Sequence, residues 1–449
     1  MQAVRSGRHV RAMDIELAHP VELRGYLEKV LGLLARADTE WTRVSRLTLR
    51  LFPRRSSDAA TAALVPACGR ALARLLPAVR VLTVAGGGDD GQTDGLLGSI
   101  ASRYAAQLVE FHGNVPVALA VPAFSAELTH LRLSLDGRTQ RLPRINAHAL
   151  RSLSLYGVGS GFSWACFGDT QNPAVVNFAS LRSIEITYGV CFLGDEDEDD
   201  GDGGGTDNAP RRRESHGEME IRLPQLRKLR IVGCPASCAL LEAGVFPEYL
   251  AQARVYGSSS ALALISSSRL RRVGRLDINV QSLDAAGGGD FYTMSNRVFG
   301  ARGPGTSSFL YVGRQVPVDP AMVEWTRLER LLVMSPLSAA TLLALVARLP
   351  RLVSLVSFRT LLVDVSDACA AHSTLPGKAR SHVERLGVIY DDTCAVEDAE
   401  MLVGHLLLGN TRLRSLTLPV AHMGMAKALV EQHRLAAPHL AGVALRPHF

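Results

Sequence analysis

Two cysteines carry the most definite chemistry in the sequence: Cys234 and Cys238 form a C-x3-C pair. A structural zinc site needs four ligands, usually two such pairs, and no second pair accompanies this one. The chain has 7 cysteines, an odd number, and most of them lie in apolar runs. That usage is typical of reduced, buried thiols. We therefore expect no metal site and a cytoplasmic or nuclear protein.

Two glycine-rich segments have spacings that bind phosphates in other proteins. Gly157-Val-Gly-Ser-Gly161 follows an expected strand, but Phe162 occupies the position of the third glycine of a dinucleotide turn. Gly300-Ala-Arg-Gly-Pro-Gly305 lacks the lysine of a phosphate loop. We predict that both are plain loops, with no cofactor. Because no nucleophile-base or paired-carboxylate constellation can be recognised, we also predict that the chain is not an enzyme.

A phosphorylation site is predicted at Ser215. The segment Arg211-Arg-Arg-Glu-Ser215 places arginines two and three residues before the serine, as basophilic kinases require. It follows an acidic stretch, 195–208, in which a kinase would have access, and added phosphate would change the local charge. The alternative is that so short a motif arose by chance.

The composition narrows the class of protein. The chain has 449 residues, of which 47% are hydrophobic, 20% charged and 6% aromatic. These values exclude a collagen, a disulfide miniprotein and a wholly disordered chain. The longest apolar run, 342–358, is interrupted by Arg348, Pro350 and Arg351. It falls short of the roughly 18 apolar residues of a spanning helix, so no membrane association is expected.

Charge is distributed unevenly along the chain. The net charge is +6, although residues 195–208 are strongly acidic. We predict a disordered insert with acidic and basic parts at 193–219 and a Gly-rich insert at 283–306. Arginine is spread along the rest of the sequence without the aromatic residues that a single-strand binding groove uses. Nucleic acid is therefore not the expected partner.

A repeated pattern, L-x-x-L-x-L with Ile, Val or Met allowed, extends from one end of the chain to the other. Its middle apolar residue, which we call the anchor, falls at 13, 47, 82, 131, 153, 184, 229, 253, 276, 331, 355, 386, 416 and 443. The alternation predicts short strands with the anchors on the buried face. Three spacings between successive anchors are longer than the rest. The spacing from 184 to 229 contains the acidic insert, and the spacings from 82 to 131 and from 276 to 331 predict extra strands near 108–111 and at 309–313.

Helical periodicity appears between the expected strands. Apolar residues recur at i, i+3, i+4 and i+7 within 23–31, 64–75, 342–349 and 399–406. Strands and helices alternating mostly every 22–35 residues predict an α/β solenoid: one domain over 1–449, with a curved parallel sheet on the concave side and helices on the convex side.

The phrases ALRSLSL, SLRSIEI, QLRKLRI and RLRSLTL resemble the leucine-rich repeat superfamily over nearly the whole chain. LRKLRIVGC resembles the cysteine-containing repeats of F-box proteins, with Cys234 at the turn. Those proteins carry a helical module ahead of the repeats that binds an adaptor of a cullin ubiquitin ligase. Only 12 residues precede Met13, so either the module is missing or the chain is a shortened version.

The residues beside the anchors are expected to line the concave sheet, a surface suited to binding a macromolecule. Arginine and tyrosine are enriched in interface hot spots. The candidate partner-binding residues are Arg132, Tyr156, Arg230, Arg254, Tyr256 and Asp277. We expect an acidic or phosphorylated protein segment to bind against Arg132, Arg230 and Arg254. The alternative is that these residues are merely solvated.

The sequence thus predicts a non-enzymatic protein-interaction module. The family resemblance implies substrate recognition for a cullin-type ubiquitin ligase, with the ligase adaptor as a further partner. Because fold does not fix function, two alternatives stay open. One is a standalone scaffold or inhibitor without a ligase, and the other is an Arg-mediated RNA binder.

Overall fold

The computed structural model divides into two compact units. Unit 1 comprises 1–230 and 234–247, and unit 2 comprises 231–233 and 248–449. The structure describes residues 11–17, 32, 41–51, 67, 69–86, 92–114, 124–135, 142, 144–158, 162–168, 174–187, 219–232, 235–257, 262, 265–266, 270–283, 290–374, 382–390 and 394–448.

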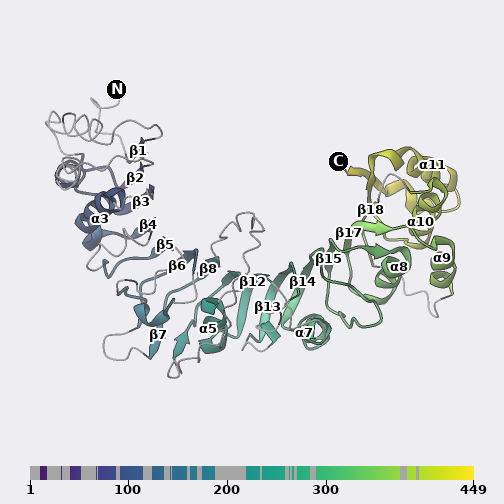
Figure 1. Ribbon diagram of the computed structural model, residues 1–449, viewed down its shortest axis with the longest axis horizontal. Coiled ribbons are helices and arrows are strands. Elements are labelled where there is room, and N and C mark those ends of the chain that lie inside the picture. Colours follow the sequence, from purple (N-terminus) through teal and green to yellow (C-terminus); the bar gives the residue numbers. More distant parts are fainter. Residues whose placement is uncertain are drawn as a thin grey trace, which may run out of the picture. The chain divides into compact units, whose positions relative to one another are not determined.

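Unit 1 is built on a parallel sheet (Figure 1). In order of pairing, its strands are β1 (Ala12–Leu17), β2 (Arg46–Leu51), β3 (Val81–Gly86), β4 (Glu110–Asn114), β5 (His130–Ser134), β6 (Ser152–Tyr156) and β8 (Ser183–Thr187). β10 (Lys228–Val232), of which residues 228–230 belong to unit 1, pairs with β8. The register aligns the anchors, so that Leu131 lies beside Leu153, which lies beside Ile184. All three are at most 1% exposed.

The outer layer of unit 1 changes character along the chain. It begins with helices: residues 69–75 are helical, and α3 (Gln92–Tyr104) continues into the short 3-10 helix η2 (Ala105–Gln107). Further on it consists of η3 (Trp164–Phe167), α5 (Pro235–Ala243) and a second parallel sheet. The strands of that sheet pair in the order β7 (Val175–Asn177), β9 (Glu220–Arg222) and β11 (Gly244–Val245).

Unit 2 has the same kind of parallel sheet. Its strands pair in the order β12 (Tyr249–Gly257), β13 (Arg272–Val280), β14 (Gly305–Val312), β15 (Arg330–Val333), β17 (Ser354–Leu361), β18 (Arg385–Tyr390), β19 (Ser415–Pro419) and β20 (Ala444–His448). A two-residue strand, β16 (Leu337–Ser338), also pairs with β17. Leu331, Leu355, Leu386 and Leu416 lie side by side in the buried face.

Helices form the outer layer of unit 2. They are α7 (Asp290–Phe299), α8 (Ala339–Arg348), α9 (Val365–Ser373), α10 (Val396–Gly409) and α11 (Met423–His433), with the 3-10 helices η4 (Val420–His422) and η5 (Pro438–Gly442). Figure 1 shows α8 to α11 along one side of the strands β17 and β18. Each helix turns an apolar stripe inward; in α8 the stripe includes Leu342, Leu345 and Val346.

The α/β class with a large parallel sheet is confirmed. Thirteen of the fourteen anchors lie in strands, and the two extra strands expected in the long intervals are β4 and β14. The expected helices at 342–349 and 399–406 are α8 and α10. The expected helix at 23–31 lies outside the described residues. Burial of each anchor leucine contributes about 1.5–3 kcal/mol, which explains why this one pattern locates the strands.

The predicted position of the last anchor, Val443, was wrong by two residues. Val443 lies before β20, and Leu445 is the residue in register with Leu416. The reason is η5, which takes up the residues before the strand and buries Leu440 instead. The hydrogen bond from the Ala444 amide to the Arg414 carbonyl, 2.8 Å long, then sets the register.

Helices were expected in the outer layer along the whole chain. In the later part of unit 1, short strands take the place of some of them. The connections there contain Gly157 and Pro173, residue types that interrupt helices, and short extended segments form the second sheet instead. Conversely, the range 283–306 taken as a Gly-rich insert contains α7, in which Phe291 and Phe299 are buried. Of the acidic insert 193–219, only 219 lies within the described residues.

Candidate functional site

Alternation along the strands gives each sheet one face of buried anchors and one face of accessible side chains, which we call the open face. In β5, for example, Leu131 and Leu133 are buried, whereas His130, Arg132 and Ser134 are exposed. The same alternation holds in β6 and β8. Side chains on the open face of neighbouring strands lie close enough to interact, and in each unit they form an ordered group.

In unit 1 this group extends over four strands, and we call it the unit 1 row: Arg132 on β5, Tyr156 on β6, Glu185 on β8 and Arg230 on β10. The Arg132 guanidinium carbon lies 4.5 Å from the centre of the Tyr156 ring, a cation–π contact. The Tyr156 hydroxyl donates to Glu185 Oε2 at 2.9 Å. The other oxygen, Oε1, lies 2.8 Å from Arg230 Nη1. Contacts therefore run through the whole row.

The row has a defined electrostatic character. Burial, and then the hydrogen bond to Glu185, raise the pKa of the Tyr156 phenol, so the hydroxyl stays a donor. The row contains two guanidiniums, of which Arg230 pairs with Glu185 and Arg132 stacks on Tyr156, and one carboxylate, so its formal charge is about +1. The Arg230 side chain is 49% exposed and that of Glu185 is 23% exposed. The row can thus contact an anionic or aromatic group from outside.

In unit 2 the corresponding group is compact, and we call it the unit 2 cluster: Arg254 on β12 with Arg275 and Asp277 on β13. Arg254 Nε lies 3.1 Å from Asp277 Oδ2. Arg275 Nε lies 3.0 Å from each oxygen of the same carboxylate. The side chain of Asp277 is only 10% exposed, whereas those of Arg254 and Arg275 are 37% and 44% exposed. One carboxylate near the sheet thus holds two guanidiniums that reach outward.

The unit 2 cluster lines a hollow of about 260 Å³ together with Tyr256, Asn279 and Phe309. The side-chain oxygen of Asn279 is buried and has no hydrogen-bond partner within the described residues. A buried acceptor without a partner costs free energy, so this position is a local weak point beside the hollow. The hollow therefore combines outward guanidiniums with aromatic side chains.

The structure brings the six predicted residues into these two groups. Arg132, Tyr156 and Arg230 belong to the unit 1 row; Arg254 and Asp277 belong to the unit 2 cluster, and Tyr256 lines its hollow. Their role in binding stays a prediction. Ser215 lies outside the described residues. The residues absent from the predicted set are Glu185, Arg275, Asn279 and Phe309. All of them occupy open-face positions, which is the signal that identifies them.

The glycine-rich segments and the cysteine pair considered in the sequence analysis lie only partly within the described residues. Gly300 to Gly305 connect α7 to β14, so a strand follows these glycines, as expected. Cys234 and Gly159 to Gly161 lie outside the described residues, and the side chain of Cys238 is not described. Within the described part of the chain, no three His, Cys, Asp or Glu side chains are grouped so as to hold a metal ion.

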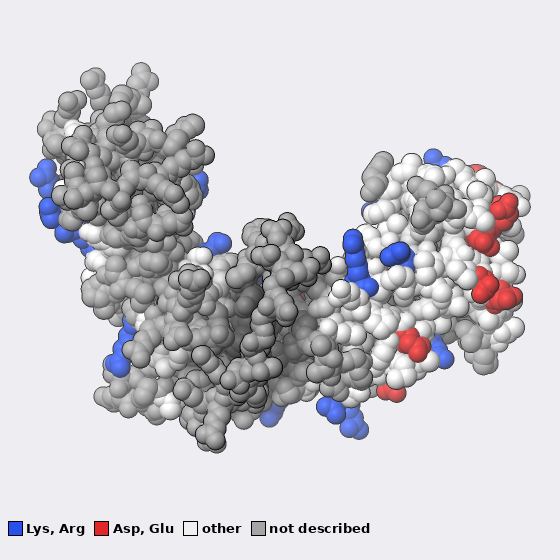
Figure 2. All heavy atoms as spheres, viewed as in Figure 1, with Lys and Arg blue, Asp and Glu red and all other residues white. Residues whose placement is uncertain are grey.

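Charge outside the open faces also has a pattern in unit 2. On the face shown in Figure 2, acidic side chains gather where α9, α10 and α11 lie. Glu397 and Asp398 occupy the first turn of α10, and Asp367 that of α9, where the helix dipole favours them. None of the described helices has the length and apolar character needed to cross a membrane.

In comparisons with known proteins, no family model matches this chain, and no curated protein matches it.

Proposed function

We propose that this chain is a non-enzymatic protein-interaction module, a solenoid of the leucine-rich repeat type that binds a protein partner on its concave face. In this proposal the partner contacts the open face of each unit. The observation that supports the proposal is the pair of ordered groups, the unit 1 row and the unit 2 cluster, on accessible sheet positions. Rigid strands hold the arginines and tyrosine there at little entropic cost, which favours binding.

The partner carries an acidic or phosphorylated segment. In both groups arginines outnumber carboxylates, and the side chains of Arg230, Arg254 and Arg275 are more exposed than the carboxylates with which they pair. Guanidinium forks that an acid has already oriented can bind a second anion with little loss of side-chain freedom. The cellular role is substrate recognition for a cullin-type ubiquitin ligase, as the resemblance to F-box proteins implies, in the cytoplasm or nucleus.

Affinity purification of the tagged full-length chain from native cells, followed by mass spectrometry at two salt concentrations, tests this proposal. The variants are Arg230→Glu and Arg254→Glu. The matched control is Arg434→Glu, because Arg434 is 57% exposed and pairs only loosely, at 3.7 Å, with Glu431. We expect the partner to be lost with the first two variants and kept with the control.

The proteins recovered separate the alternatives. The ligase adaptor and cullin would support the ligase role, whereas a salt-resistant partner without them would identify a scaffold or inhibitor. Recovery that is lost steeply with salt and abolished by nuclease would identify an RNA binder. Charge reversal at Arg230 and Arg254 that leaves every partner bound would end the proposal.

A further inference from the structure

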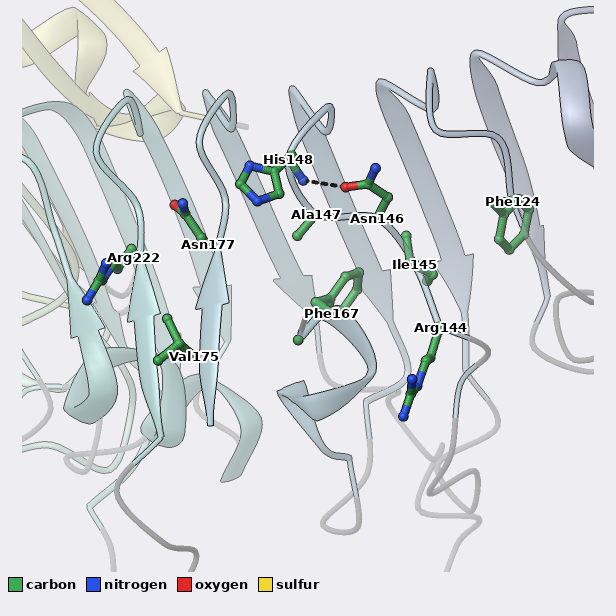
Figure 3. A pocket seen from close by; sticks show the side chains of 11 residues that line it. Phe124, Arg144, Ile145, Asn146, Ala147, His148, Phe167, Val175, Asn177 and Arg222 are labelled. Atoms are coloured by element: carbon green, nitrogen blue, oxygen red, sulfur yellow. Dashed lines mark hydrogen bonds between the residues drawn. The ribbon is translucent and has the colours of Figure 1, made fainter. Parts of the chain in front are cut away.

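A pocket of about 650 Å³ lies in the outer layer of unit 1, away from the open face (Figure 3). One side is formed by Val175 and Asn177 of β7, and the other by the chain segment 144–148. Phe167 of η3 lines it between these two sides. The volume falls within the roughly 300–1,000 Å³ typical of ligand sites.

The strand β7 is an edge strand among the described residues. Its hydrogen bonds to β9 alternate: the Ala174 carbonyl accepts from the Glu220 amide at 2.8 Å, and the Phe178 amide donates to the Arg222 carbonyl at 3.0 Å. With Val176 opposite Ile221, residues 174, 176 and 178 point their backbone groups at β9. By the geometry of a strand, the amides and carbonyls of Val175 and Asn177 point the other way, towards the pocket.

The opposite side of the pocket does not satisfy those backbone groups. Segment 144–148 is irregular: the Ile145 amide donates to the Cys166 carbonyl, and the Asn146 side chain accepts from the His148 amide. Within the described residues no backbone hydrogen bond joins this segment to β7. Among the described residues, these two amides and two carbonyls of β7 have no backbone partner and face the pocket. An exposed strand edge of this kind is a template for pairing with another chain.

The lining indicates which peptide would fit. Within the described residues no carboxylate lines the pocket, whereas Arg144 and Arg222 do. Arg222 forms two hydrogen bonds with Glu220, at 3.0 and 3.2 Å, but no ion pair or hydrogen bond of the Arg144 side chain joins the described residues. Phe124 and Phe167 supply nearly buried aromatic surface. The pocket therefore offers apolar surface and a cation to a peptide.

We propose that an extended segment of a partner protein adds to β7 as a further strand in this pocket, placing an apolar side chain against Phe167 and an acidic side chain against Arg144. Main-chain hydrogen bonds to Val175 and Asn177 provide affinity, and the alternate side chains provide specificity, as in other cases of strand addition. This site is separate from the open face and does not depend on the function proposed for it.

The substitution Asn177→Pro tests the hydrogen-bonding step. It removes an amide that faces the pocket and leaves every bond to β9 in place, and proline is tolerated where a strand's amide faces outward. Val176 before it is already in a strand, as a residue preceding proline should be. Circular dichroism and thermal melting are expected to match the wild type.

The probe is a phage library of random nonapeptides, selected on the wild-type chain and counter-selected on Asn177→Pro. We expect enriched peptides with an acidic residue and alternating apolar residues. Their affinity, measured by fluorescence anisotropy, should fall at least about tenfold with Asn177→Pro. Hydrogen exchange should show the amides of Val175 and Asn177 becoming protected when the peptide binds.

Two further variants keep the test decisive if Asn177→Pro folds poorly. Arg144→Glu should weaken binding of the acidic peptides about tenfold, and Arg230→Glu on the open face should leave it unchanged. Peptides that bind Arg144→Glu and wild type alike, or that bind without protecting the Val175 and Asn177 amides, would overturn the proposal. A selection that yields no peptide preferring the wild type would overturn it as well.

Discussion

The open faces of the two units carry similar side chains, but the contacts among those side chains are arranged differently. In unit 1 a single glutamate, Glu185, has a tyrosine on one side and an arginine on the other, and the group is spread over four strands. In unit 2 a single aspartate, Asp277, is shared by two arginines on two strands. The unit 1 row is extended, whereas the unit 2 cluster is concentrated.

The difference shows how burial of the acid changes its importance. The Glu185 side chain is 23% exposed and partly solvated. If Glu185 is removed, water can therefore replace the interactions that Tyr156 and Arg230 made with its carboxylate. The Asp277 side chain is 10% exposed and is the counter-charge for both guanidiniums, Arg254 and Arg275. Removing it leaves two neighbouring cations that repel each other and have lost their shared counter-charge. The unit 2 cluster should therefore be more sensitive to substitution and the unit 1 row more tolerant.

The largest effect is expected for Asp277→Ala. Both arginines lose their common acceptor, and hydrogen bonds to charged groups are each worth about 1.5–3 kcal/mol. Because the arginine side chains are 37% and 44% exposed, water recovers part of the loss. We expect local destabilisation of unit 2 by about 2 kcal/mol, which is roughly a 30-fold increase in exchange of the β13 amides. Hydrogen exchange with mass spectrometry measures it.

Glu431→Ala is the matched control in the same unit. Its pair with Arg434 is 3.7 Å long, with side chains 71% and 57% exposed, and such surface pairs contribute about 0–1 kcal/mol. If Asp277→Ala lowered the stability of unit 2 by no more than Glu431→Ala does, the shared carboxylate would have no special role. The contrast between the two units would then be wrong.

Sequence predicts the positions of these groups better than their pairing. The L-x-x-L-x-L pattern reports directly which side chains are buried, so Arg132, Arg254 and Asp277 could be placed on the open face. That Glu185 joins Tyr156 to Arg230 depends on side-chain rotamers across three strands. That Arg275 shares Asp277 with Arg254 depends on the register between β12 and β13. Neither is encoded in a local pattern.

The outer layer was less predictable for a related reason. A helix such as α8 has its own periodicity and can be identified alone, but β7 and β9 are three residues long and owe their form to pairing with each other. Strands that short have little intrinsic preference. The edge of β7 and its pocket are thus products of tertiary structure, which explains why no motif indicated them.

A smaller effect is expected for Glu185→Ala. Arg132 still stacks on Tyr156, so the row loses its anion and keeps its aromatic contact. We expect the local stability of unit 1 to fall by about 1 kcal/mol. A double-mutant cycle with Arg230→Ala, followed by hydrogen exchange in β8, should give a coupling of about 0.5 kcal/mol. A cost equal to that of Asp277→Ala would show that exposure of the acid does not distinguish the two groups.

The smallest effect concerns the ionisation of Tyr156. Since its pKa is raised in the folded protein, first by burial and then by Glu185, the phenol keeps its proton at pH values where the unfolded chain has lost it. Stability is therefore lost as pH rises from the unfolded pKa, near 10, through the folded one. In Glu185→Ala the pKa of Tyr156 should fall but stay above its ordinary value, and alkaline destabilisation should be milder.

The difference in tyrosinate absorbance between Glu185→Ala and Glu185→Ala/Tyr156→Phe isolates this one phenol. A return all the way to the ordinary value would mean that the glutamate, not burial, dominates the environment of Tyr156. The unit 1 row would then be held by its acid as the unit 2 cluster is by Asp277. A titration that stays raised would instead show that the sheet itself shields Tyr156, so that a spread-out row survives the loss of its only carboxylate.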